Sequence, residues 1–303
     1  MPNLSSWNRR GSFERLQSSL SFRLGPISEF IVSHWPMPRR LPIKETRDLT
    51  LLSMCGRRHL SMLQECLLSI YKTWSKIPHL KIVSDGSMSK EEIYGALSWW
   101  PCSYETFDWK EIAESERYKS QRYECISAFA QKSVVGRKLM SILYFGSQEP
   151  TLYCDADILW FDGLPGMSLI KAKDVQLALM EDYQPSYDES LSSDDTLGSL
   201  PYLNSGLVYI NEDLLEFPWF RDFVKQATVS SNHFTEQTIL AMSAHEVSSF
   251  SWDPDKIACS VYKRDSLSPT FLGETWAARH YVGGVRHLFW RDAIALRIKY
   301  MMP

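Results

Sequence analysis

The sequence predicts an α/β fold with a mostly parallel central sheet flanked by helices. Residues 49–55 (LTLLSMC) and 80–83 (LKIV) are short apolar runs typical of buried strands, and apolar residues recur at helical spacing between them. A strand–helix–strand order implies two parallel strands joined by a right-handed crossover. The 303 residues, 44% of them apolar, suffice for one large domain of this class.

Later segments continue the alternation of strands and helices. Residues 89–97 begin with a serine and two glutamates, a pattern typical of a helix start. A third strand is expected at 102–107, mostly helical chain at 108–145, and a further strand at 175–180. Residues 184–201 lose all periodicity, and a loop of this length is either a lid or an insertion without a role. The last helices are expected at 214–224 and 289–302.

The composition argues against several classes of protein. The net charge is −3, which gives no electrostatic reason to expect a nucleic-acid partner. The six cysteines form no CxxC pair, so neither a zinc site nor a dense disulfide framework is expected. No apolar run reaches the ~20 residues of a membrane span, and no signal-peptide core is seen. We therefore expect a cytoplasmic protein.

The first 47 residues differ from the rest in charge. They hold eight basic and three acidic residues, a net charge of +5, which leaves −8 for residues 48–303. Three prolines between residues 36 and 42 disfavour a long helix, so we expect an irregular extension (1–47) ahead of the domain (48–303). It is either packed over the domain or a basic arm that contacts an anionic membrane or a partner. Its candidate anchors are Phe22, Phe30 and Trp35.

Two aspartates, Asp155 and Asp157, lie within the apolar stretch 151–161 (TLYCDADILWF). Ionised carboxylates in such a setting are costly unless they face a cleft, a cation or a partner charge. On an extended chain residues i and i+2 point to the same side, so both carboxylates could converge on one divalent metal. Carboxylate ligands suit Mg²⁺ or Mn²⁺, which often also hold substrate phosphates. The alternative interpretation is an ordinary turn at a strand end.

Polar groups also follow the two earlier strands. Gly56-Arg57 comes after the first strand and Asp85-Gly86-Ser87 after the second. Ligands of parallel α/β sheets bind beyond the carboxyl ends of the strands, where both segments are expected to lie. Asp-Gly is also common in ordinary turns, so both interpretations stay open.

Three stretches after the aspartates also contain candidate ligand-binding residues. Residues 202–211 (YLNSGLVYIN) read as a strand that contains a glycine, which often marks the close approach of a ligand or another backbone. Thr235 is a candidate N-cap, followed by Glu236-Gln237. Residues 279–290 (RHYVGGVRHLFW) combine a histidine, two glycines and an arginine.

In their order along the chain, these stretches resemble the nucleotide-sugar glycosyltransferases with the GT-A fold, and in particular the glycogenin and lipopolysaccharide galactosyltransferase group. The resemblance covers about residues 49–290. It implies a Rossmann-like mixed sheet and transfer of a hexose from a nucleotide diphosphate sugar, expected to be a UDP-sugar. The acceptor would be a hydroxyl of a saccharide, a lipid-linked molecule or a protein, and the anomeric configuration would be retained.

The resemblance also implies a role for each matching residue. The metal ligands for Mn²⁺ (or Mg²⁺) would be Asp155, Asp157 and His280. The donor-binding residues would be Gly56, Arg57, Asp85, Lys138, Asp155, Asn204, Ser205, Gly283, Gly284 and Arg286. The catalytic residues would be Gln237 and Glu236, with Asp182 or Glu236 as general base if the enzyme instead inverts. This sequence departs from the family at Lys138 (Arg), Glu236 (Asp), Arg286 (Lys) and His287-Leu288 (Pro-Trp).

Two rival functions remain at this point. A sugar-phosphate nucleotidyltransferase would normally carry a glycine-rich basic loop after its first strand, where this chain has only Gly56-Arg57-Arg58. A non-catalytic member of the fold would bind sugar or a partner without turnover, and the complete set of three metal ligands argues against it.

Overall fold

The computed structural model describes residues 12–120, 123–172, 174–191, 198, 200–259 and 276–301. Its strands are β1 (Thr46–Cys55), β2 (Ile77–Ser84), β3 (Tyr104–Asp108), β4 (Thr151–Cys154), β5 (Ile158–Trp160), β6 (Leu177–Glu181), β7 (Leu203–Ile210), β8 (Ser249–Trp252), β9 (Ile257–Cys259) and β10 (Ala278–His280). Its α-helices are α1 (Ser12–His34), α2 (Leu60–Thr73), α3 (Lys90–Ala96), α4 (Trp109–Ala113), α5 (Glu124–Lys132), α6 (Val134–Gly146), α7 (Met167–Ala172), α9 (Pro218–Val229), α10 (Thr235–Ser243) and α12 (Arg286–Met301). Short 3₁₀ helices occupy Arg57–His59, Glu189–Leu191, Leu214–Glu216 and Gly283–Val285.

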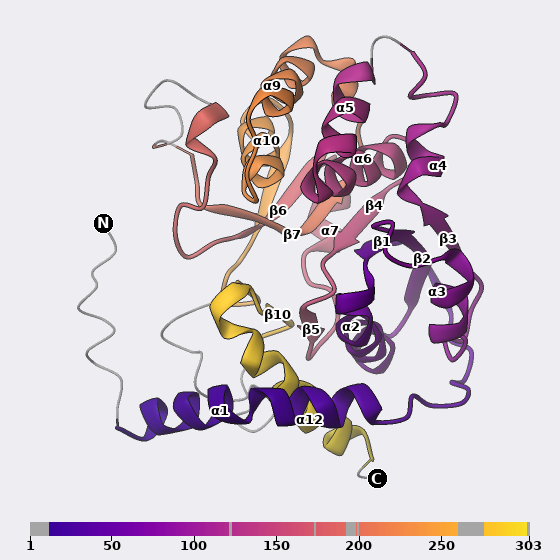
Figure 1. The fold of residues 1–303 in the computed structure, drawn as a ribbon, viewed down its shortest axis with the longest axis vertical. Coiled ribbons are helices and arrows are strands. Elements are labelled where there is room, and N and C mark those ends of the chain that lie inside the picture. Colours follow the sequence, from indigo (N-terminus) through magenta and orange to yellow (C-terminus); the bar gives the residue numbers. More distant parts are fainter. Residues whose placement is uncertain are drawn as a thin grey trace.

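A seven-stranded mixed sheet in the order β3-β2-β1-β4-β7-β6-β8 forms the centre of the molecule (Figure 1). Strands β3, β2, β1 and β4 are parallel, whereas β7 runs antiparallel to both of its neighbours, β4 and β6. The expected mostly parallel sheet flanked by helices is therefore confirmed. Because β7 is reversed, its first residues lie at the same edge of the sheet as the last residues of β4 and β6.

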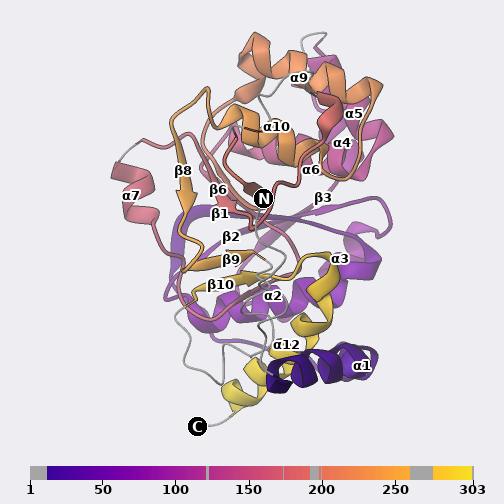
Figure 2. The same ribbon diagram turned by 90° about the vertical axis from the view of Figure 1, so that its left-hand side faces the viewer.

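Helices cover both faces of this sheet, and alternate residues of each strand face opposite helical layers. In β1, Leu51 belongs to the core shared with α2 and α12, whereas Leu52 belongs to the core shared with α5, α6, α9 and α10. Figures 1 and 2 show these two layers on opposite sides of the sheet. Burial on both faces explains why apolar residues of β1 do not alternate with exposed polar ones from Leu49 onward.

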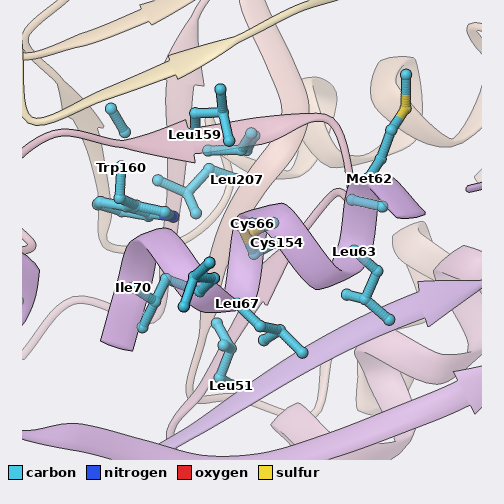
Figure 3. Close-up of a cluster of buried hydrophobic side chains, with 14 of the residues drawn as sticks. Leu51, Met62, Leu63, Cys66, Leu67, Ile70, Cys154, Leu159, Trp160 and Leu207 are labelled. Carbon is cyan, nitrogen blue, oxygen red and sulfur yellow. Dashed lines mark hydrogen bonds between the residues drawn. The ribbon is translucent and has the colours of Figure 1, made fainter. Parts of the chain in front are cut away.

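Helix α2 packs its apolar face between the first strands and β5 (Figure 3). Leu63, Leu67 and Ile70 are fully buried there, and burying each stabilises the fold by roughly 1.5–3 kcal/mol. The Cys66 and Cys154 sulfurs lie 3.8 Å apart without a disulfide bond. All six cysteines lie within the described residues and are free thiols, in agreement with the sequence analysis.

A second, three-stranded sheet with the order β5-β10-β9 brings distant parts of the sequence together. Strand β10 pairs antiparallel with β5, so that His280 lies opposite Ile158. The N–H of Tyr281 also donates to the carbonyl oxygen of Asp157 at 3.0 Å. This pairing joins His280 to the segment that carries the two aspartates.

The prediction that residues 1–47 are irregular is wrong for residues 12–34, and residues 1–11 lie outside the described residues. Residues 12–34 form helix α1, which contains Pro26 and ends just before the series of prolines that begins at Pro36. It packs along α12, and that tertiary contact compensates for the backbone hydrogen bond lost at the proline (Figures 1 and 2). Phe30 is 63% exposed and is not an anchor. Phe22 is 68% exposed and touches the domain only at the edge of the His287 ring, whereas Trp35 contacts the guanidinium of Arg297.

No helix within the described parts of the chain is both long and apolar enough to span a bilayer. The predicted loop 184–201 is described only in part, because residues 192–197 and 199 lie outside the described residues.

Candidate active site

The candidate site lies where the direction of the strands changes, between parallel β1 and β4 and antiparallel β7. The residues that follow β1, β2, β4 and β6 and those that open β7 all reach this edge. They line a pocket of about 800 Å³, large enough for a nucleotide sugar. This is the usual ligand position in open α/β sheets. The lining includes Gly56, Asp85, Lys138, Asp155, Asp157, Asp182, Asn204, Ser205, Glu236, Gln237, His280, Gly283 and Arg286.

Asp155, Asp157 and His280 form a cluster with ligand atoms that all lie within 4.8 Å of one another. The Nε2 atom of His280 is 3.0 Å from Oδ1 of Asp157 and 3.7 Å from Oδ2 of Asp155. The sequence analysis assumed that the two carboxylates converge because residues i and i+2 of a strand point to the same side. This assumption is wrong. Residues 155–158 form a turn closed by the Ile158 N–H and the Asp155 carbonyl oxygen, and this turn brings the side chains together.

The Asp157 carboxylate is held ionised by its neighbours. Burial works against its charge, but His280 and Arg286 outweigh burial and hold the pKa of Asp157 well below its usual range. The guanidinium of Arg286 reaches the second carboxylate oxygen, while its own side chain stays 46% exposed. Two carboxylates beside an imidazole fit a divalent metal such as Mn²⁺.

His280 is fixed from the side opposite the carboxylates. Its Nδ1 atom lies 3.1 Å from Oδ1 of Asn204, which also accepts a hydrogen bond from the N–H of Gly206. A Cβ atom at residue 206 would lie 2.2 Å from Cε1 of His280, so only glycine allows the ring this position. The glycine in strand β7 thus marks the close approach of a side chain, which the sequence pattern allowed but did not specify.

Lys138 connects the cluster of Asp155, Asp157 and His280 to the predicted catalytic pair, Glu236 and Gln237. Its Nζ atom lies 3.1 Å from Asp155 Oδ2, 3.1 Å from Glu236 Oε1 and 3.2 Å from Ser205 Oγ. Burial disfavours the ammonium group, but Asp155 and Glu236 outweigh burial and raise the pKa of Lys138 above its ordinary value. The Ser205 hydroxyl also donates to Glu236 Oε1 at 2.7 Å. No donor within the described residues reaches the other oxygen, Oε2 of Glu236, although it is buried in the pocket wall.

Gln237 is held by both ends of its amide. Its Oε1 atom accepts from the N–H of Ser205 at 3.3 Å, and its Nε2 atom donates to the carbonyl oxygen of Ser186 at 2.8 Å. The predicted N-cap at Thr235 is wrong, because the helix is capped by Phe234 and Thr235 is its first residue. The Thr235 hydroxyl instead donates to the Asp188 carboxylate, which ties α10 to the first part of the 184–201 loop.

Asp182 lies on the wall formed by the end of β6. Its Oδ2 atom accepts a hydrogen bond from the Asn204 amide at 3.1 Å. Burial raises the pKa of Asp182, while this hydrogen bond and that from the Tyr183 N–H oppose the rise. Asp182 is thereby linked through Asn204 to His280.

The predicted donor-binding turns occupy the other end of the pocket. Gly56 packs against Asp85 so closely that a Cβ would lie 2.0 Å from the carboxylate oxygen Oδ2. Gly86 has a φ of 96°, a conformation that favours glycine. Arg57 points elsewhere, because its guanidinium pairs with Glu92 at 2.6 Å and it does not line the pocket. Gly283 lines the pocket, and Gly284 follows it in the same 3₁₀ helix.

Tyr153 in the pocket lining and Arg137 behind it are among the polar residues that the sequence analysis did not select. The Tyr153 hydroxyl donates to Asp155 Oδ1 at 2.7 Å, a pair that the i, i+2 spacing along β4 could have indicated. Arg137 donates to the Asp85 carbonyl oxygen at 2.7 Å and stacks on Trp109, so it holds the Asp85 turn in place. No local pattern signals this second contact.

Solved glycosyltransferases have a similar fold. A galactosyltransferase, LgtC, solved in complex with donor and acceptor sugar analogues, is 14% identical, with 81% of this chain and 95% of that chain covered and a TM-score of 0.50. Mouse xyloside xylosyltransferase 1 is 12% identical, with 80% and 98% covered and a TM-score of 0.52. The bifunctional glycosyltransferase WbbM is 10% identical, with 86% and 53% covered and a TM-score of 0.51.

The sequence itself matches no protein-family model and no curated protein. At these identities the similarity concerns the fold alone. The candidate site lies at the strand ends of that fold. The chain therefore has the GT-A fold of these glycosyltransferases.

Proposed function

We propose that this protein is a metal-dependent glycosyltransferase that moves a hexose from a UDP-sugar to an acceptor hydroxyl with retention of configuration. The observation that carries the proposal is the joining of two features in one pocket. A set of three potential metal ligands lies at one end of a buried network, and an unpaired carboxylate oxygen, Glu236 Oε2, lies at the other. Lys138 connects the two.

The metal ligands and the arginine would serve the leaving group. Asp155, Asp157 and His280 would hold Mn²⁺ or Mg²⁺, and such an ion neutralises negative charge on a diphosphate. Arg286 is half exposed, so its guanidinium is free to turn from Asp157 and donate to phosphate oxygens. The Gly56–Asp85 end of the pocket would bind the nucleoside, with Gly283 close to the diphosphate.

The sugar would lie against Glu236 and Gln237. A buried carboxylate oxygen without a donor is costly, and a sugar hydroxyl would satisfy Glu236 Oε2. Lys138 and Ser205 fix the other oxygen of the same carboxylate, so Oε2 is already oriented before the sugar arrives. Gln237 is held on both sides, which suits a group that stabilises positive charge on the anomeric carbon at a fixed position.

The experiment is calorimetric titration of UDP into wild type and Asp157→Asn, with Mn²⁺ and with chelator. UDP should bind wild type only when the metal is present. The variant should lose this metal-dependent binding of UDP and keep the thermal unfolding profile of wild type. Asp222→Asn is the matched control, because Asp222 is an exposed carboxylate that pairs with Lys225 on α9, outside the pocket lining. Equal UDP affinity in wild type and Asp157→Asn, with and without metal, would contradict the proposal. A thermal-shift panel of nucleotide sugars would then identify the donor.

A further inference from the structure

Helix α1 presents its large apolar residues to solvent and its small residues to the protein. Leu20, Leu24, Ile27 and Ile31 follow the spacing i, i+4, i+7 and i+11, so they form one stripe along the helix. Their exposed fractions are 47%, 48%, 56% and 42%. The stripe facing α12 contains two serines, Gly25 and Val32, of which the last two are buried.

This orientation is the reverse of what a helix packed only for stability would adopt. Gly25 lies against the side chain of His287, where the Cβ of a larger residue would come within 3.3 Å of His287 Cβ. The small stripe thus lets α1 lie close to α12, which in turn packs on the domain. Figures 1 and 2 both show α1 at the outside of the molecule, next to α12. The large apolar stripe faces away from every described element.

The charges around the stripe indicate what covers it. Arg23 is exposed and falls between Phe30 and Ile27 around the helix axis, and Arg39 and Arg40 are exposed just beyond the helix. Glu29 is the one acidic residue among the described side chains of α1, and it projects on the other side of the helix. A second copy of the chain would bring two cationic faces together, which disfavours a symmetric dimer through this face.

We infer that the exposed face of α1 (Leu20, Leu24, Ile27, Phe30 and Ile31, with Arg23) binds the surface of an anionic lipid membrane. An apolar face flanked by arginines is the pattern of helices that lie in the membrane interface: the aliphatic side chains enter the acyl boundary and the guanidinium groups meet the lipid phosphates. Helix α1 would lie on the bilayer and not cross it, in keeping with its mixed composition.

Helix α1 reaches the candidate site with its other side, from which Phe22 projects. The ring of Phe22 packs edge-on against the ring of His287, with 5.5 Å between their centroids, and His287 lines the pocket. A membrane bound by the exposed face would thus be separated from this rim of the pocket by the width of the helix, roughly 10 Å.

The test is flotation of the full chain with vesicles of phosphatidylcholine, with and without phosphatidylglycerol. Binding should require phosphatidylglycerol and weaken in high salt. Leu24→Gln/Ile27→Gln should lower the affinity about ten-fold or more, and neutralising Arg23, Arg39 and Arg40 about five-fold per charge. The matched control is Val229→Gln, since Val229 is 88% exposed at the end of α9 in the opposite helical layer.

A second readout shows where the lipid contact occurs. With Cys102, the one partly exposed native cysteine, replaced by serine, a polarity-sensitive dye on Ile27→Cys should shift to the blue with anionic vesicles. The same dye on Val229→Cys should not. Absence of binding, equal binding to both vesicle types, or a dimer that Leu24→Gln/Ile27→Gln abolishes would each overturn the inference. These assays contain neither nucleotide nor metal, so their outcome is independent of the proposed transferase activity.

Discussion

Arg286 donates two hydrogen bonds to the same carboxylate oxygen of Asp157, from Nε at 3.1 Å and from Nη2 at 2.9 Å. The guanidinium thus binds a carboxylate that the proposed metal would need as a ligand. A diphosphate that draws Arg286 away would at the same time release Asp157, so nucleotide and metal are expected to strengthen each other's binding.

Replacing Arg286 by lysine should separate these two effects. Lysine keeps the charge but loses the planar fork, so it should hold Asp157 less firmly. We expect Mn²⁺ alone to bind Arg286→Lys roughly three- to ten-fold more tightly than wild type, and UDP to enhance metal binding less. Titration of Mn²⁺ with and without UDP measures both quantities. Identical metal affinity in the two proteins would show that the Arg286–Asp157 contact does not compete with the metal.

Gly206→Ala should damage the metal cluster without unfolding the protein. The new methyl group would lie 2.2 Å from Cε1 of His280, so the ring would have to leave its position beside Asp157. Mn²⁺ affinity should fall at least about ten-fold, as for loss of a residue that orients a metal ligand. Gly95→Ala is the matched control, because no atom lies near the added Cβ in α3 and alanine should stabilise that helix slightly. Unchanged metal affinity in Gly206→Ala would exclude His280 as a ligand.

Asp188→Asn tests how the loop that bears Ser186 is fastened to α10. Asp188 is buried and accepts hydrogen bonds from the hydroxyls of Thr235 and Ser190 and the Ser190 N–H. Burial disfavours its charge, but these bonds outweigh burial and hold the pKa of Asp188 below its ordinary value. The asparagine variant should lose about 1–3 kcal/mol of unfolding free energy at pH 7.

The pH dependence of that loss follows from the direction of the pKa shift. A carboxylate whose pKa is lower in the folded state stabilises the protein at pH values above its pKa in the unfolded state, about 4. This stabilisation disappears as the pH falls through the lower pKa of the folded state. Urea unfolding of wild type and Asp188→Asn should therefore differ most at neutral pH, and the difference should shrink below about pH 4. A difference that is constant with pH would rule out the ionised form of Asp188 as the source.

The sequence predicted the sheet because β1, β4 and β7 are buried on both faces, so apolar residues dominate their buried parts. It predicted where polar residues gather because strand ends of a parallel sheet share one edge. It did not predict α1, since a helix containing Pro26 gains its stability from contact with α12 at the far end of the chain. Nor could local spacing show that Lys138 pairs with both Asp155 and Glu236, because three separate segments meet there.

The stereochemical prediction depends on the environment of Glu236 and Gln237. An inverting enzyme needs a carboxylate base beside the acceptor hydroxyl, on the face of the sugar opposite the leaving group. Lys138 and Ser205 hold Oε1 of Glu236, and Oε2 has no donor among the described residues, so Glu236 suits binding of a sugar hydroxyl better than removal of a proton. We therefore expect an α-linked product from an α-linked donor.

Gln237→Ala and Glu236→Gln should then affect different steps. Gln237→Ala should lower kcat about ten- to a hundred-fold with little change in donor affinity, if its amide acts mainly as charge builds on the sugar. Glu236→Gln should instead weaken donor binding, because it removes the carboxylate that pairs with Lys138 and receives the sugar hydroxyl. The anomeric proton coupling of the product, measured by NMR, decides the outcome: a β-linked product would contradict retention and would make Asp182 or Glu236 the general base.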